Sequence, residues 1–192
     1  MRWADYYTRK AKEENWLARS VYKLQEIDKR VNLIKKGDKV LDMGCYPGSW
    51  SQYCLKKVGK KGFVTGIDVK EPERLKAENF LFIKADIFKL DPVWLKEKIG
   101  IQDVLLSDMA PNTTGIDNVD VIRSLALANR AFEFVFYLLK KGGNFVCKVF
   151  EGEGFIDFRK KVSLYFDKTR LIKPKSTRKN SREIFIIGIG KK

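Results

Sequence analysis

The stretch Lys39-Val-Leu-Asp-Met-Gly-Cys-Tyr-Pro-Gly-Ser-Trp50 decides the fold of this chain. It joins a short apolar run, Lys39–Met43, to a turn that contains Gly44 and Gly48, and then leads into a helix. Glycines at such a turn let the backbone approach a ligand closely, and the first N–H groups of the new helix are available to it. The stretch therefore predicts a ligand site beyond the carboxyl end of a strand. It does not provide the Gly-x-Gly-x-x-Gly spacing of a dinucleotide site.

Apolar runs and helical segments continue to alternate on the carboxyl side of this stretch. Further strands are expected at Phe63–Asp68, Phe80–Ala85, Val104–Ser107, Asn144–Phe150, Thr169–Ile172 and Ile184–Ile189. We also expect a helix capped by Ser20 and ended by Gly37-Asp38, a helix over Asp120–Leu139 stopped by Gly142-Gly143, and a helix over Phe155–Phe166. This alternation, without repeats or a linker, predicts a single α/β domain over residues 1–192, with a parallel sheet covered on both faces.

Positive charge is concentrated at the two ends of the chain. The formal net charge is +15. Residues 1–36 carry ten Lys and Arg against five Asp and Glu, residues 159–192 carry twelve against two, and the segment between them is neutral. A neutral body with basic ends suggests that the ends hold a polyanion. We expect the helical segment 1–36 to contribute to RNA binding, and Lys173–Arg182, which mixes cations with hydroxyls, to contact phosphates.

Several classes of site are disfavoured by what the composition lacks. The chain has no histidine, which removes Ser-His-Asp and Cys-His catalysis and histidine-ligated metals. Its three cysteines, Cys45, Cys54 and Cys147, form no Cys-x-x-Cys pair, so disulfides and a zinc site are not expected. No apolar run approaches the roughly 18 residues of a membrane span, and the N-terminal residues do not read as a secretion signal. We expect a cytoplasmic monomer that needs no metal and binds no membrane.

Lys148 lies within Asn144-Phe-Val-Cys-Lys-Val-Phe150, which otherwise reads as a buried strand. An ammonium group there is costly unless something pairs with it or needs it deprotonated. A desolvated lysine can lose its proton and act as a general base. The alternative is a lysine at a strand end that reaches solvent or pairs with a carboxylate. Cys147, its neighbour on the opposite face of the strand, is expected to pack in the core.

Acidic residues follow three of the other expected strands. Asp68 is placed to accept hydrogen bonds from ribose hydroxyls, and Asp86 is placed to reach an adenine amino group. Asp108 begins Asp108-Met-Ala-Pro-Asn112, in which the proline stiffens the loop that faces the ligand. Together with the glycine turn, these acids predict a cofactor that carries a nucleoside. On pattern alone, Lys23, on the first helix, and Glu183, just before the last strand, read as solvated surface charges.

Five ordered motifs, spread over nearly the whole chain, resemble the FtsJ/RrmJ ribosomal RNA methyltransferases. They are Arg19–Glu26, Asp42–Gln52, Ser107–Asn112, Lys148–Gly154 and Ser181–Glu183. The resemblance implies a Rossmann-like, S-adenosylmethionine-dependent methyltransferase fold, with a seven-stranded, mostly parallel sheet and an antiparallel last strand. It also implies methyl transfer to a ribose 2′-hydroxyl, in a uridine of the A loop of 23S rRNA in the large ribosomal subunit.

The same resemblance assigns roles to individual residues. The catalytic set that it implies is Lys23, Asp108, Lys148 and Glu183, with Lys148 as the general base. The cofactor contacts that it implies, together with the glycine turn, are Gly44, Gly48, Trp50, Asp68, Asp86 and Asp108. The chain departs from the family pattern where Cys45 and Tyr46 stand in place of small residues and where Ser49 replaces a glycine. Ser49 fits only if its φ is not positive.

The proposed chemistry leaves alternatives open. Lys148 would take the proton of the attacking hydroxyl, with Lys23 as the nearby cation that helps to neutralise it. A Lys148 that stays charged would instead orient the hydroxyl and stabilise the developing oxyanion. Competing functions are 2′-O-methylation of tRNA or an mRNA cap, a non-catalytic RNA-binding protein, and an NAD-dependent oxidoreductase, which the glycine spacing disfavours.

Overall fold

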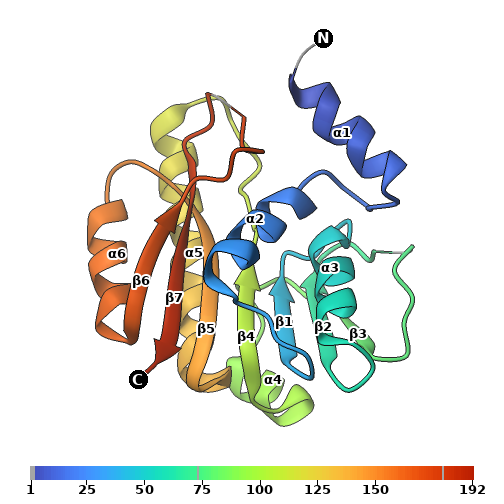
Figure 1. The fold of residues 1–192 in the computed structure, drawn as a ribbon. Coiled ribbons are helices and arrows are strands. Elements are labelled where there is room, and N and C mark those ends of the chain that lie inside the picture. The colour runs from blue at the N-terminus through green and yellow to red at the C-terminus, as the bar shows by residue number, and fades with distance from the viewer. Residues whose placement is uncertain (1–2, 73, 179) are drawn as a thin grey trace.

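The computed structural model describes residues 3–72, 74–178 and 180–192. Its centre is a seven-stranded sheet in the order β3-β2-β1-β4-β5-β7-β6 (Figure 1). The strands are β1 Lys39–Met43, β2 Phe63–Asp68, β3 Phe80–Lys84, β4 Gln102–Ser107, β5 Leu139–Phe150, β6 Phe166–Ile172 and β7 Glu183–Lys191. The β1–β2, β2–β3, β1–β4 and β4–β5 pairs are parallel, whereas β7 is antiparallel to both β5 and β6. The expected α/β fold with an antiparallel last strand is confirmed.

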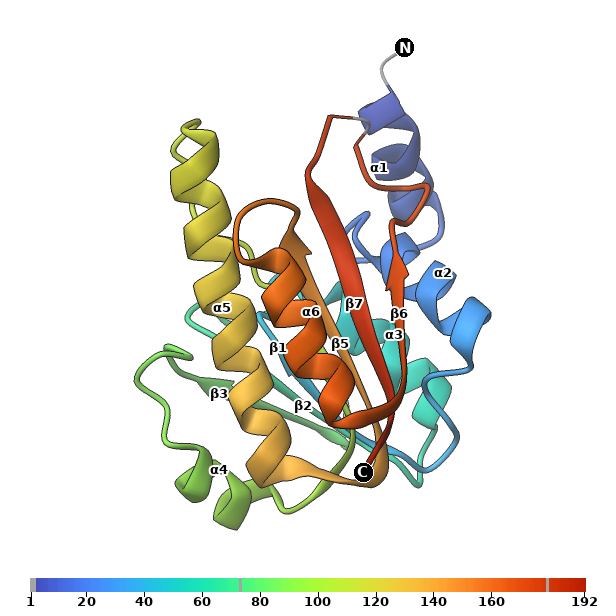
Figure 2. The same cartoon turned by 90° about the vertical axis from the view of Figure 1, so that its left-hand side faces the viewer.

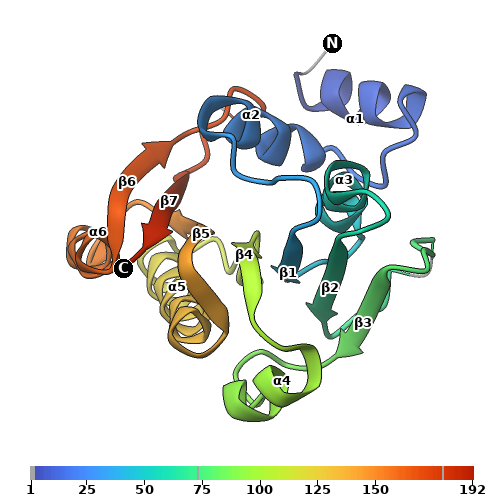
Figure 3. The ribbon, with the colours of Figure 1, turned by 60° about the horizontal axis from the view of Figure 1, so that its bottom comes forward.

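Helices cover both faces of the sheet, as Figures 2 and 3 show. They are α1 Trp3–Glu13, α2 Val21–Val31, α3 Ser49–Val58, α4 Pro92–Ile99, α5 Asp117–Leu138 and α6 Phe155–Leu164. Helices α4, α5 and α6 pack against one face in the larger apolar cluster, which includes Leu41, Leu95, Phe132 and Phe158. Helices α2 and α3 cover the other face around Leu24, Trp50 and Phe185. Helix α1 lies apart from the sheet and packs on the start of α2 through Ala11 and Tyr22.

The expected end of the helix after Ser20 is wrong. Helix α2 stops at Val31, because Asn32 adopts a left-handed conformation with φ of 51°. The buried carboxylate of Asp28 then accepts hydrogen bonds from the N–H groups of Leu33 and Ile34, at 2.9 and 3.0 Å, and so fixes the turn well before Gly37. Ser20 precedes the helix as expected, but its hydroxyl is bonded to the Ser49 hydroxyl at 2.8 Å and caps no helical N–H.

The long helix ends within one residue of the expected Leu139, but Gly142-Gly143 does not stop it. Helix α5 stops at Leu138 and the chain passes directly into β5 at Leu139, so Gly142 and Gly143 lie inside the strand. Leu139 is buried and suits either element, and therefore the apolar pattern does not mark the boundary. The remaining expected strands agree with the observed ones to within three residues at either end.

The turn after β1 is shaped by glycine. Gly44 has φ of +78°, and a Cβ placed on it would lie 2.4 Å from Met109 Cγ, in the loop that follows β4. The close approach of the loops after β1 and β4 therefore requires glycine at this position. Gly48 has φ of +106° and precedes α3, where Leu17 and Pro72 crowd it.

Asp42 anchors this turn from inside the sheet. Its side chain is fully buried in β1, and its Oδ2 accepts a hydrogen bond of 2.6 Å from the Ser51 hydroxyl in α3. Its Oδ1 is buried and has no hydrogen-bond partner among the described residues. Burial, opposed by the Ser51 hydrogen bond and reinforced by the charges of Asp108 and Asp68, raises the pKa of Asp42 to about 7.

The raised pKa predicts that Asp42 makes the fold less stable as the pH increases. Because the folded-state pKa lies above the unfolded value of about 3.9, its contribution is complete below pH 4 and is lost as the pH rises through 7. Between pH 5 and pH 8 the loss should be about 2–3 kcal/mol in the free energy of unfolding. Asp42→Asn should remove this loss, as measured by urea unfolding at both pH values.

The control is Asp157→Asn, the same chemical change at an exposed carboxylate on α6. It should keep the pH dependence of the parent chain. If the parent and the Asp42→Asn variant have parallel unfolding profiles, the titration of Asp42 within this range is refuted.

Candidate active site

A pocket of about 700 Å³ opens at the carboxyl ends of β1 to β4, where the sequence places the ligand. Its walls come from the loops that follow these four strands and from one face of α5. The lining residues are Gly44, Tyr46, Ile67, Asp68, Val69, Lys70, Ala85, Asp86, Ile87, Phe88, Asp108, Met109, Ala110, Pro111, Asn112, Arg123, Ala126 and Leu127. Of the expected cofactor contacts, Gly44, Asp68, Asp86 and Asp108 are therefore brought together in one cavity.

The Asp68 carboxylate is held in place by the backbone. Its Oδ2 accepts a hydrogen bond from the Tyr46 N–H, and its Oδ1 accepts one from the Lys70 N–H, each at 3.0 Å. Two fixed donors hold the side chain at the end of β2 and leave lone pairs that can receive ligand hydroxyls. Tyr46 is half exposed at the rim of the pocket, and the Lys70 ammonium lies 5.7 Å from the centre of its ring. This placement shows how the chain accommodates a large residue in the turn.

Asp86 is positioned by the short loop after β3. Its Oδ1 accepts a hydrogen bond of 3.0 Å from the Phe88 N–H. Arg130 of α5 fixes this loop, because its guanidinium donates hydrogen bonds to the carbonyls of Ile87 at 2.8 Å and Leu90 at 2.5 Å. Arg130 was not among the residues expected from sequence, because a basic residue in the middle of an amphipathic helix reads as a surface charge.

Gly48 and Trp50 do not line this pocket. Gly48 packs beside Leu17 and Pro72 at the start of α3. Trp50 is buried between α2, α3 and β7, where its indole N–H donates to the Ser20 carbonyl at 2.9 Å. Their expected cofactor contacts stay predictions. Ser49 begins α3, and positive φ values among the described non-glycine residues occur only at Asn15 and Asn32, so Ser49 is accommodated without strain.

Lys148 and Asp108 form a buried ion pair at the edge of the pocket. The Lys148 ammonium donates to Asp108 Oδ1 at 2.9 Å and to the Asp108 carbonyl at 2.5 Å. The Lys148 side chain is only 5% exposed and that of Asp108 is 15% exposed. This answers the question raised by a lysine in a buried strand, because the charge is paired and also bonded to the backbone.

Lys23 and Glu183 form a second ion pair on the same side of the sheet. Lys23 Nζ lies 2.6 Å from Glu183 Oε1, and both side chains are mostly buried. The Phe185 ring connects the two pairs, because Phe185 is the cross-strand partner of Lys148 and lies 5.8 Å below the Lys23 ammonium. Lys23 and Glu183 are thus paired and mostly buried, so their interpretation as solvated surface charges is wrong, and their catalytic roles stay predictions.

The loop between β6 and β7 is tied over this cluster. Arg19 donates to the Ser176 carbonyl at 2.8 Å, and the Thr177 hydroxyl lies 3.4 Å from Glu183 Oε1. Arg182 pairs at 2.6 Å with Asp117, at the start of α5. The loop is therefore held beside Glu183, and Arg182 reaches the start of α5. Cys147 packs in the core on the opposite face, where burial raises its pKa to about 12, as expected of a structural thiol.

The residues that line the pocket fit S-adenosylmethionine. The pocket volume is typical of small-molecule sites, and the glycine turn allows close backbone approach. Asp68 and Asp86 are acceptors, which ribose hydroxyls and an adenine amino group require. Among residues 3–72, 74–178 and 180–192, no group of His, Cys, Asp or Glu could hold a metal ion, and no helix is long and apolar enough to cross a membrane.

Comparisons with known proteins agree with this geometry. The family model of the FtsJ-like methyltransferases, which use S-adenosylmethionine, matches residues 16–191. Ribosomal RNA large subunit methyltransferase E of Desulfatibacillum aliphaticivorans is 50% identical over 190 residues, which cover 99% of this chain and 92% of that protein. The enzyme of the same name from Bdellovibrio bacteriovorus is 46% identical over 191 residues, which cover 98% of this chain and 97% of that protein.

Solved structures support the same assignment. The crystal structure of a ribosomal RNA methyltransferase from Plasmodium falciparum superposes with a TM-score of 0.80 at 29% identity, covering 92% of this chain and 98% of that one. The fibrillarin/NOP5P complex matches with a TM-score of 0.64 at 18% identity, over 86% of this chain and 78% of that one, and shows the fold alone. On its sequence and its fold together, the chain belongs to the FtsJ-like methyltransferase family.

Proposed function

We propose that this protein transfers a methyl group from S-adenosylmethionine to a ribose 2′-hydroxyl of a uridine in the A loop of 23S rRNA, within the large ribosomal subunit. The observation that carries this proposal is the Lys148–Asp108 ion pair beside a cofactor-sized pocket, with Lys23 and Glu183 next to it. The rRNA large subunit methyltransferases that are about half identical over nearly their whole length support the substrate class. We further infer that the protein is a monomer. We also infer that it acts in the cytoplasm, where unmethylated subunits are available.

Lys148, Asp108, Lys23 and Glu183 have different roles in the proposed reaction. S-adenosylmethionine, when bound, supplies an electrophilic methyl group on a sulfonium. Lys148 accepts the proton of the ribose hydroxyl as its oxygen becomes nucleophilic. Asp108 orients the Lys148 amine through the 2.9 Å contact. Glu183 holds Lys23 nearby, and Lys23 supplies positive charge where the hydroxyl oxygen becomes negative.

The resting geometry is compatible with either role of Lys148. Lys148 donates to a carboxylate and to a carbonyl, and both the charged and the neutral amine have enough N–H groups to do so. To serve as a base, Lys148 must first release a proton, whereas an ammonium that only orients the hydroxyl needs no such step. The base must be the neutral amine, whereas the orienting group must be the charged ammonium. The dependence of the reaction rate on pH therefore distinguishes the two roles.

Lys148→Ala should lower turnover by about 10²–10⁴-fold, the usual contribution of a general base, while S-adenosylmethionine affinity changes by less than about twofold. Methyl transfer to unmethylated large subunits and cofactor binding by calorimetry give the two values. The matched control is Lys141→Ala, an exposed lysine at the other end of β5, which should keep full turnover. Retained turnover in Lys148→Ala would refute its catalytic role.

The pH dependence of the parent enzyme should distinguish the base from the orienting cation. For a base, kcat/KM should rise about tenfold per pH unit on the acidic side, and this rise should disappear in Lys148→Arg, which keeps the charge but cannot be deprotonated. A flat profile together with an active Lys148→Arg would replace the base with a charged Lys148 that orients the hydroxyl.

Binding of RNA by the basic ends should depend strongly on salt. Each phosphate contact adds roughly 0.7–0.9 to the slope of log affinity against log salt concentration. Replacing Lys173, Lys175 and Arg178 with Gln should therefore lower the slope by about two to three. Fluorescence anisotropy with an A-loop RNA measures the slope.

Three exposed lysines of the neutral central segment provide the control. Replacement of Lys84, Lys89 and Lys96 by Gln should leave the salt slope almost unchanged. If both triple variants lose the same slope, the electrostatic role assigned to residues 159–192 fails.

A further inference from the structure

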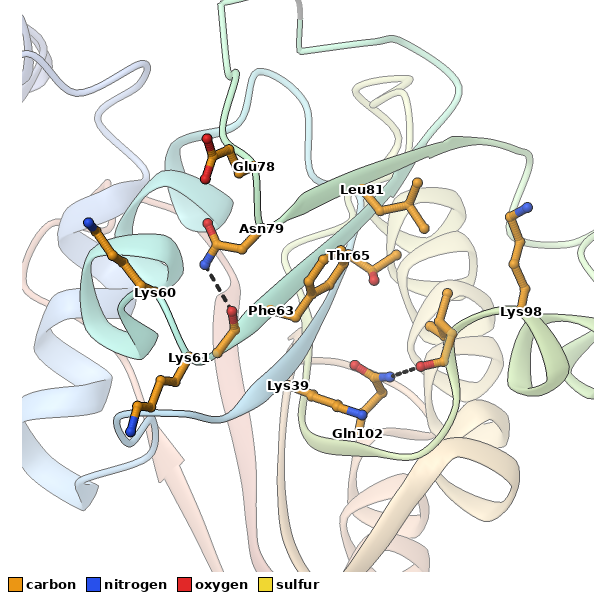
Figure 4. Close-up of a pocket in the computed structure, with 12 residues that line it drawn as sticks. Lys39, Lys60, Lys61, Phe63, Thr65, Glu78, Asn79, Leu81, Lys98 and Gln102 are labelled. Carbon is orange, nitrogen blue, oxygen red and sulfur yellow. Dashed lines mark hydrogen bonds between the residues drawn. The ribbon is translucent and has the colours of Figure 1, made fainter.

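A second pocket, of about 620 Å³, lies at the opposite edge of the sheet, where β1 to β4 begin (Figure 4). It shares no lining residue with the candidate active site. Phe63 starts β2 and Asp68 ends it, so the two pockets are separated by about 17 Å along that strand. The lining residues are Lys39, Lys60, Lys61, Gly62, Phe63, Thr65, Glu78, Asn79, Leu81, Lys98, Ile99 and Gln102.

The pocket exists because the sheet is left uncovered at this corner. Helix α4 ends at Ile99, and Phe63 beyond it is 38% exposed, whereas Ile67, on the same face of β2, is only 1% exposed. Leu81 and Ile99, both partly buried, line the pocket with Phe63 and add apolar surface to it. An apolar floor that includes an exposed ring offers a stacking surface for a nucleobase.

Positive charge surrounds this floor. Lys39, Lys60, Lys61 and Lys98 line the pocket against the single carboxylate of Glu78, which gives it a net charge of +3. All four lysines are exposed, and none forms an ion pair within the described part of the chain. The cluster stands out because residues 37–158 are neutral overall. Its charge is complementary to phosphate.

Two buried or half-buried amides are fixed at the rim. Asn79 donates its side-chain N–H groups to the carbonyls of Gly59 and Gly62, at 3.0 and 2.9 Å. Gln102, which is 2% exposed, donates to the carbonyls of Ile99 and Gly100, at 3.0 and 3.1 Å. With their amide nitrogens engaged in this way, the side-chain oxygens of both residues are acceptors with fixed orientation. Such acceptors suit the exocyclic amino groups of bases.

We propose that this pocket binds an unpaired nucleotide of the RNA substrate, with the base on Phe63 and the flanking phosphates on Lys39, Lys60, Lys61 and Lys98. The RNA identity of the ligand rests on the proposed function. The enzyme then contacts its substrate at both edges of the sheet, at the methylated ribose and at a remote single-stranded segment. The remote contact adds affinity and does not take part in the chemistry, so its loss raises KM and leaves kcat unchanged.

The test uses the full chain and a fluorescein-labelled, single-stranded RNA of 12 nucleotides. The double variant Lys60→Glu/Lys61→Glu should bind this RNA about tenfold more weakly at 0.1 M salt, with a salt slope lower by about 1.4. The matched control, Lys89→Glu/Lys96→Glu, makes the same change of charge at exposed lysines outside both pockets and should bind as the parent does. Equal binding by the two double variants would overturn the proposal.

A second variant keeps the charge and removes the ring. Phe63→Leu should weaken RNA binding by about tenfold without changing the salt slope, because stacking is lost and the phosphate contacts remain. With RNA that carries 4-thiouridine, ultraviolet light should cross-link the parent chain within residues 60–65, and Phe63→Leu should lose this cross-link. Thermal unfolding confirms that each variant is folded.

The source of the nucleotide is tested by competition. Free cytidine monophosphate, whose base carries an exocyclic amino group, should not displace the cross-link at millimolar concentration, since the pocket gains affinity from several phosphates of one strand. Displacement by the mononucleotide would overturn the RNA assignment in favour of a free nucleotide. Methyl transfer by the parent enzyme is measured separately. If the second pocket binds no RNA, the proposed function still stands. If the reaction proves to be different, RNA binding by the second pocket is still tested.

Discussion

The buried positive charge of Lys148 is the constraint on which the site depends. An ammonium group inside a sheet requires a partner that is equally well placed, and the Asp108 carboxylate and carbonyl provide it from the loop after the neighbouring strand. That loop lies where it does because Gly44 has no Cβ to meet Met109. The glycine turn that shapes the cofactor pocket therefore also positions the carboxylate that pairs with the lysine.

The antiparallel strand completes this arrangement. Strand β7 runs opposite to β5, so Glu183, at its start, lies near Lys148, at the carboxyl end of β5. Helix α2 lies over this face and brings Lys23 to Glu183. A sheet with a parallel last strand would place residue 183 at the opposite edge, away from the pocket. The topology thus explains how residues separated by 160 positions form one cluster.

Much of this was predictable from the sequence. The strands, the α/β sheet and the gathering of Asp68, Asp86 and Asp108 follow from apolar runs that end in acids, because the carboxyl ends of parallel strands share one edge. Lys23 and Glu183 needed the family resemblance, since nothing local distinguishes them from surface charges. The end of α2 was mispredicted because Asn32 fits more than one local structure, and Gly142-Gly143 was misread as the stop of α5 because the apolar Leu139 suits either a helix or a strand.

Other features depend on tertiary contacts that no pattern reveals. The Arg130 clamp joins positions about 40 residues apart, and Phe185 is recognised only once the register of β5 and β7 is known. The lysines of the second pocket, at the amino ends of β1 to β4, come from three separate segments of a neutral region, so charge averaged along the chain conceals them.

The acceptor proposed for this protein is a ribose hydroxyl of large-subunit RNA. The most direct measurement offers methyl-labelled S-adenosylmethionine with unmethylated large ribosomal subunits and with bulk tRNA, side by side, followed by alkaline hydrolysis of the RNA. Transfer to a ribose hydroxyl should leave label in subunit RNA, within a dinucleotide that resists alkali because its 2′-oxygen is methylated. Label on a base, label only in tRNA, or no label in either RNA would contradict it.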